Sequence, residues 1–92
     1  MRIVGEIKHP VYKITLFKMD TRYSVKFEDR DLEQTYKFRE GAIVQSLKDV
    51  YALMDKAFMD LVDQAFEQMR NASVQALAQA QERHLDEFDE II

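Results

Sequence analysis

Glycine and proline are confined to the first part of this chain. The two glycines and the single proline are Gly5, Gly41 and Pro10, so neither residue type occurs after residue 41. Both disfavour helices, since glycine costs about 1 kcal/mol relative to alanine in a helix interior and proline about 3 kcal/mol. The chain is therefore expected to divide into an N-terminal part of strands and turns, residues 1–41, and a helix-forming part, residues 42–92.

Composition indicates one globular domain. The 92 residues suffice for one modest hydrophobic core. A hydrophobic fraction of 47% and a charged fraction of 33% are typical of folded rather than disordered chains. No apolar run approaches the roughly 18 residues that span a membrane, and Glu6 interrupts the start too early for a signal peptide. We therefore expect a cytoplasmic protein that does not enter a membrane.

Four segments alternate apolar and polar residues in the way that predicts β-strands. They are residues 2–8, 11–19, 23–28 and 33–39. The connections are short, which favours hairpins and hence an antiparallel meander of three or four strands. One face of this sheet is apolar, and its residues are Tyr12, Ile14, Leu16, Tyr23, Val25, Phe27, Tyr36 and Phe38. Because an apolar face must be covered, the helical part is expected to pack on it, giving an α+β fold.

The helical part begins with a capping signal. Ser46, with Asp49 three residues later, predicts a helix start. Apolar residues then recur at spacings of three and four, which predicts an amphipathic helix whose apolar stripe covers the sheet. The stripe comprises Leu47, Val50, Tyr51, Met54, Phe58, Leu61, Val62, Ala65, Phe66 and Met69.

The helical part is too long for the sheet. A helix from Ser46 to Glu90 would extend roughly 67 Å at ~1.5 Å per residue, whereas a compact domain of this size has a radius of gyration of about 12 Å. The last 20 or so residues must therefore fold back or project. Folding back needs a break near residues 71–73, where Asn71 and Ser73 suit a turn and a new cap. The absence of glycine and proline there favours an unbroken helix, and both arrangements remain open.

A projecting helix would expose an apolar stripe that a helix-pairing dimer would bury. The stripe comprises Val74, Leu77, Leu85, Phe88 and Ile92. We therefore expect a small, non-enzymatic interaction module that forms a homodimer through its C-terminal helical region. An additional, unidentified protein partner could use the same helices or the edge of the sheet.

Binding of nucleic acid or another anion through the outer sheet face is the alternative. Residues 1–45 carry a net charge of +2 and residues 46–92 a net charge of −6, which together give the −4 of the chain. The outward positions of the strands hold Lys13, Phe17, Lys26, Lys37 and Arg39. Cations beside an aromatic ring can bind phosphates and stack bases. With one aromatic and an acidic chain, however, an ordinary solvated face is the simpler interpretation, and nucleic acid is not the expected partner.

Residue types that carry common chemistries are sparse. The chain has no cysteine, which excludes disulfides, thiolate metal sites and thiol nucleophiles. His84 and Glu87 share a predicted helix face, but in the reverse order of the Glu-x-x-His pairs of di-metal bundles. Asp60, Asp63 and Glu67 are expected to form a solvated face away from the apolar stripe. His9, before Pro10, is expected to be an exposed turn residue, so no catalytic site, metal or cofactor is predicted.

Overall fold

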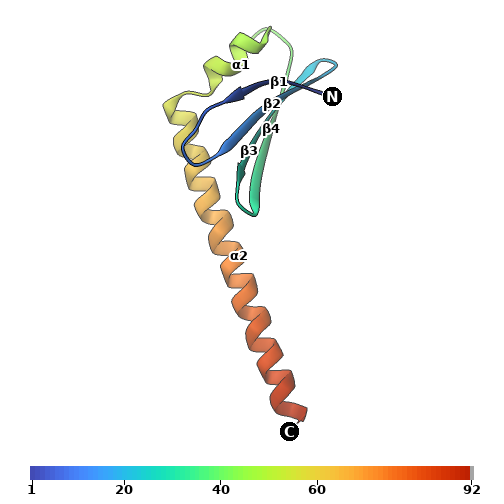
Figure 1. The fold of residues 1–92 in the computed structure, drawn as a ribbon, viewed down its shortest axis with the longest axis vertical. Helices are drawn as coiled ribbons and strands as arrows, with labels where there is room; N and C mark the ends of the chain where they lie inside the picture. Colours follow the sequence, from blue (N-terminus) through green and yellow to red (C-terminus); the bar gives the residue numbers. More distant parts are fainter. Residues whose placement is uncertain (92) are drawn as a thin grey trace.

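A computed structural model describes the backbone of residues 1–91 and the side chains of residues 1–84. Within these residues the chain forms a four-stranded antiparallel sheet followed by two helices (Figure 1). The strands are β1 (Arg2–Ile7), β2 (Lys13–Met19), β3 (Arg22–Asp29) and β4 (Leu32–Arg39), and the helices are α1 (Leu47–Leu53) and α2 (Lys56–Ile91). The predicted α+β fold, a meander with a long C-terminal helix, is confirmed.

The sheet is a meander in which sequential strands are neighbours, in the order β1-β2-β3-β4. Two-residue turns join β2 to β3 and β3 to β4, because Met19 pairs with Arg22 and Asp29 with Leu32. The first residue of each turn, Asp20 or Arg30, has a positive φ, of 52° and 57° respectively. Aspartate tolerates this left-handed conformation better than a long side chain such as arginine does.

The core lies between the predicted apolar face of the sheet and the two helices. On that face the β2 and β3 residues are buried, and Tyr36 and Phe38 of β4 are half-buried. Val50 of α1, Val62 and Phe66 of α2, and Tyr12 and Val44 of the connections also belong to the core. Gln34 of β4 is a buried polar residue on the same face, and its Nε2 donates a hydrogen bond to the Val62 carbonyl at 3.0 Å. This bond joins the sheet directly to the backbone of α2.

The helical part is interrupted at Met54 and Asp55, so the single helix predicted from Ser46 is wrong. Asp55 Oδ1 accepts the Phe58 N–H at 2.9 Å, which caps the start of α2. The predicted start of α1 is confirmed, since Asp49 Oδ2 accepts the Ser46 N–H at 3.2 Å. The interruption reorients the chain, and Leu61, which the continuous pattern placed in the stripe, is 61% exposed.

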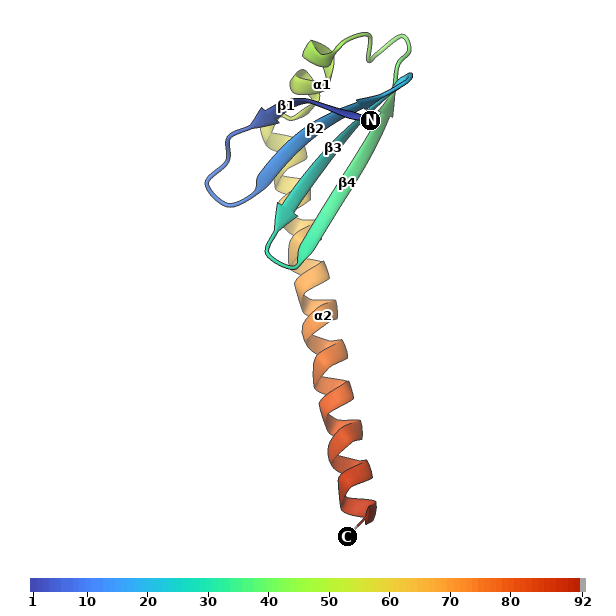
Figure 2. The same ribbon diagram turned by 45° about the vertical axis from the view of Figure 1, so that its right-hand side comes forward.

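The second half of α2 projects from the domain. The helix continues through residues 71–73, so the break that would have folded it back is absent. Figures 1 and 2 show α2 crossing one face of the sheet and then extending past the β3–β4 turn. The molecule consequently measures 64 × 27 × 22 Å, with a radius of gyration of 18.7 Å. Every residue from Asn71 to His84 is exposed.

Candidate interaction surfaces

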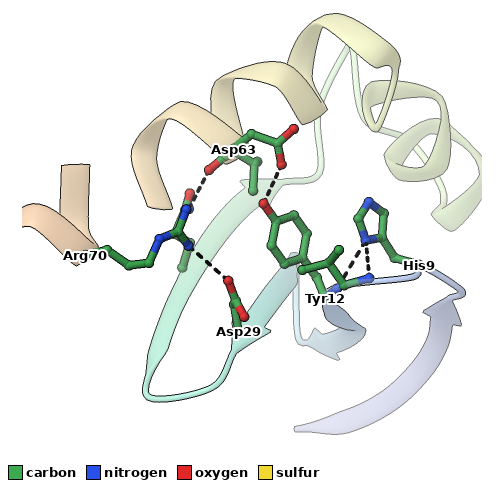
Figure 3. A network of polar contacts seen from close by, with 8 residues as sticks. His9, Tyr12, Asp29, Asp63 and Arg70 are labelled. Atoms are coloured by element: carbon green, nitrogen blue, oxygen red, sulfur yellow. Dashed lines mark hydrogen bonds and ion pairs between the residues drawn. The ribbon is translucent and has the colours of Figure 1, made fainter. Parts of the chain in front are cut away.

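A polar network fixes the direction in which α2 leaves the sheet (Figure 3). The hydroxyl of Tyr12, the residue just before β2, donates a hydrogen bond to Asp63 of α2. About two turns further along α2, Arg70 Nη1 donates to Asp29 Oδ2 of β3 at 3.1 Å. Burial, together with the hydrogen bond to Asp63, raises the pKa of Tyr12 to about 12. Asp63 is therefore part of the contact between helix and sheet, which corrects the prediction of a purely solvated acidic face.

His9 supports the same network from the β1–β2 connection. Its Nδ1 accepts the N–H groups of Val11 and Tyr12, each at 3.1 Å. Its ring stacks on Tyr12 with centroids 4.7 Å apart and planes 6° apart, and Tyr12 also packs on Phe66 at 4.9 Å. The half-buried His9 thus shapes the turn and positions Tyr12, rather than being the exposed turn residue that was predicted.

The projecting part of α2 carries an exposed apolar face. Val74 is 65% exposed and Leu77 is 70% exposed. Arg70, Val74, Leu77 and Gln81 follow one another at spacings of four, three and four residues, so all four lie on one side of the helix. At 3.6 residues per turn, this side lies roughly a quarter of a turn from the Val62 stripe that packs on the sheet. The apolar face of the projecting segment is therefore separate from the core stripe.

Three residues of the predicted self-association stripe have side chains outside the described residues. For Leu85 and Phe88 the structure describes the backbone, which is part of α2, and Ile92 lies outside the described residues. Of the five predicted residues, the structure thus places two, Val74 and Leu77, and both are on the projecting helix rather than against the sheet.

A cleft of about 440 Å³ opens where α2 leaves the sheet. The end of the sheet forms one wall and α2 the other. Its lining residues are Val11, Asp29, Arg30, Asp31, Leu32, Arg70, Ser73 and Val74. Val11 is 62% exposed, like Val74, so the cleft extends the apolar face of the projecting helix towards the sheet. Sequence reasoning missed this site because its two walls come from distant parts of the chain.

Strand register assembles the predicted basic residues on the outer sheet face. Ser24 of β3 lies between Phe17 and Lys37, and the next residue pair on that face is Arg22 opposite Arg39. Arg22 was missed, because its place opposite Arg39 follows from the register of the β3–β4 hairpin. Lys13, at the other end of this face, is paired in register with Glu28.

Part of this basic face is already neutralised. Lys26 Nζ lies 2.9 Å from Glu28 Oε1 and 5.5 Å from the centroid of the Phe17 ring. The ion pair raises the pKa of Lys26 and lowers the pKa of Glu28. A base that stacked on Phe17 would have to displace the lysine. Arg22, Lys37 and Arg39 form no ion pair with any side chain of residues 1–84, so they are the available cations.

Neither a metal site nor a membrane span is found in the described part of the chain. Among these residues no group of three or more His, Cys, Asp or Glu side chains is placed to hold a metal ion. Asp60 is paired with Lys56, at 3.0 Å, rather than with another acid. No described helix is both long and apolar enough to cross a bilayer.

Comparison with known proteins adds no relative. The chain matches no protein-family model, no curated protein and no solved structure. The two surfaces described above, the apolar face of the projecting helix with its adjoining cleft and the basic end of the outer sheet face, are therefore the basis for a functional proposal.

Proposed function

We propose that this protein is a non-enzymatic interaction module that forms a homodimer by pairing the projecting segments of α2, residues 71–91. The observation that carries the proposal is the exposure of every described residue from Asn71 to His84 in an uninterrupted helix. Most of the stability of a helix in a protein comes from packing of its apolar face, not from intrinsic propensity. A segment that leaves its own sheet needs another surface to supply that packing.

The sequence of the segment supports a second copy as that surface. Val74 and Leu77 are followed along the helix by Leu85, Phe88 and Ile92, at spacings that return to one side of an α-helix. Large apolar residues at such spacings are typical of helix-pairing seams. The residues between them include glutamine, alanine and acids, which suit the solvent-facing sides of a paired helix.

Solution mass tests the proposal. Because the chain is elongated, with a longest dimension of 64 Å, elution volume alone would overestimate its size, and light scattering should accompany size exclusion. We expect twice the mass of one chain for the unaltered protein. We expect a folded monomer for the double variant Leu77→Asp, Leu85→Asp, since a charge in each of two seam positions would be buried without a partner. A double variant that remained a dimer would refute helix pairing.

A second candidate function is binding of single-stranded nucleic acid at the basic end of the outer sheet face. Arg22 is directly opposite Arg39, and like charges in that relation destabilise a sheet unless an anion neutralises them. Lys37 and Phe17 adjoin this pair across the strands. This candidate predicts oligonucleotide binding that weakens steeply as salt rises and that Lys37→Glu reduces. Absence of binding at about 50 mM salt, where phosphate contacts are strong, would eliminate it.

A further inference from the structure

We infer that the cleft between α2 and the β3–β4 turn receives the C-terminal part of α2 from a second copy, so that the two helices pair antiparallel. The inference rests on the proposed homodimer and specifies its geometry. The cleft and the exposed apolar face are continuous, because Val74 belongs to both and Arg70 and Leu77 lie one turn to either side of it.

Antiparallel pairing about Gln81 matches apolar positions in the two helices. With the two-fold axis at Gln81, Val74 lies opposite position 88 of the partner and Leu77 opposite position 85. These positions are Phe88 and Leu85, so the two layers on either side of the axis each join two large apolar residues. The central layer pairs Gln81 with its own copy, and the outermost layer pairs Arg70 with position 92. Position 88 of the partner thereby reaches the mouth of the cleft, whose apolar wall includes Val11 and Leu32.

Charge favours the antiparallel over the parallel arrangement. The sequence Asp86-Glu87-Phe88-Asp89-Glu90 is strongly acidic. Parallel pairing would bring the two copies of this segment side by side, where like charges repel. Antiparallel pairing separates them and places each beside Arg30 and Arg70 of the other copy. Arg70 already pairs with Asp29, and Asp31 also lines the cleft, so Arg30 is the main cation at this site.

The backbone at Arg30 is a second observation that points to the cleft. Its φ of 57° is in the left-handed region, where a residue with a long side chain costs roughly 1–2 kcal/mol and glycine would be favoured. Residues held in such conformations often occur at binding sites. An arginine at this turn position, on the wall of the cleft, is consistent with recognition of an acidic segment.

Distance measurement between spin labels tests the inference. The chain has no cysteine, so Gln68→Cys, at an exposed position of α2, allows a single label in each copy. Antiparallel pairing about Gln81 places the two labels about 40 Å apart along the helices at ~1.5 Å per residue. Parallel pairing in register would place them within about 20 Å, given helix axes 8–10 Å apart.

The outcomes separate this inference from the proposed function. A dimer with the long separation supports both. A dimer with the short separation refutes antiparallel pairing but leaves the homodimer intact, whereas a labelled monomer refutes both. As a second measurement, Arg30→Glu should weaken the dimer about fivefold or more, because each lost charge pair occurs twice in a symmetric dimer. Adding Glu87→Arg should restore the dimer, because position 87 flanks the seam about 100° from position 88 and the added arginine would pair with the introduced glutamate. The matched control Lys48→Glu, exposed on α1 and outside the cleft lining, should leave dimerisation unchanged.

Discussion

Truncation of Leu77 is the sharpest perturbation of the proposed dimer. Leu77→Ala removes an apolar side chain that is 70% exposed in the single chain, and it keeps a good helix former at the position. The fold of the chain should therefore change in stability by no more than about 0.5 kcal/mol. Any larger effect on assembly reports on the dimer alone.

The magnitude follows from the area that pairing would bury. Removing the three outer carbons of leucine forfeits about 0.8 kcal/mol for each when they are fully buried. Because the side chain is already partly covered, and a two-helix seam leaves part of it exposed, we expect roughly 1–1.5 kcal/mol for each copy. A symmetric dimer contains the change twice, so the total is about 2–3 kcal/mol, which corresponds to a Kd raised about 30- to 140-fold.

Leu61→Ala is the matched control. Leu61 lies on the same helix and is 61% exposed, but it is about 160° around the helix axis from Leu77 at 3.6 residues per turn. Sedimentation velocity over a dilution series gives Kd for both variants and for the unaltered chain, and circular dichroism checks that the helix persists. The account is refuted if Leu77→Ala leaves Kd unchanged, or if Leu61→Ala raises it as much.

Three other substitutions test contacts and backbone geometry that determine the stability of the fold. Tyr12→Phe should cost about 1–2 kcal/mol in urea unfolding, because it removes a hydrogen bond to a carboxylate. Folding raises the pKa of Tyr12 from 10.0 to about 12. The protonated hydroxyl therefore stabilises the folded state fully below pH 10, and this contribution is lost as the pH rises from 10 to about 12. The phenylalanine variant should lack that decline; an identical decline in both proteins would contradict the assignment. Gly5→Ala should destabilise by about 1 kcal/mol, because a Cβ there overlaps the Tyr51 hydroxyl. The loss of stability caused by Gly5→Ala should be smaller when Tyr51→Ala is also present, because the overlapping hydroxyl is then absent. Arg30→Gly should raise the thermal midpoint, equivalent to at most about 1 kcal/mol, by relieving the positive φ; a lower midpoint would show that the arginine side chain stabilises the turn.

The sheet was predictable because the patterns that determine it lie within single strands and the short turns between them. Alternation along each strand marked the buried face, and two-residue turns set the pairing of β2 with β3 and of β3 with β4. The burial of Gln34 was not predicted, because it depends on partners outside the local pattern. Gln34 occupies an inward position, and a glutamine is acceptable there because its side chain donates to the Val62 carbonyl and accepts from the Tyr36 hydroxyl.

The helical part was harder because its interruption depends on side-chain capping. Nothing in the sequence distinguishes Asp55 from the other acids until the chain turns there and its carboxylate caps Phe58. The bond between Tyr12 and Asp63 joins residues 51 positions apart, and the cleft likewise combines a hairpin turn with a helix. Contacts of this kind follow from tertiary packing and leave no periodic pattern in the sequence.

Sedimentation equilibrium of the unaltered chain tests the central claim most directly. At about 100 μM, a dimer with a micromolar Kd is almost fully associated, and it dissociates measurably on dilution. The account predicts twice the mass of one chain at the higher concentration, falling towards the mass of one chain as the protein is diluted. The mass of a single chain throughout the series would contradict the proposal that the projecting segment of α2 pairs with a second copy.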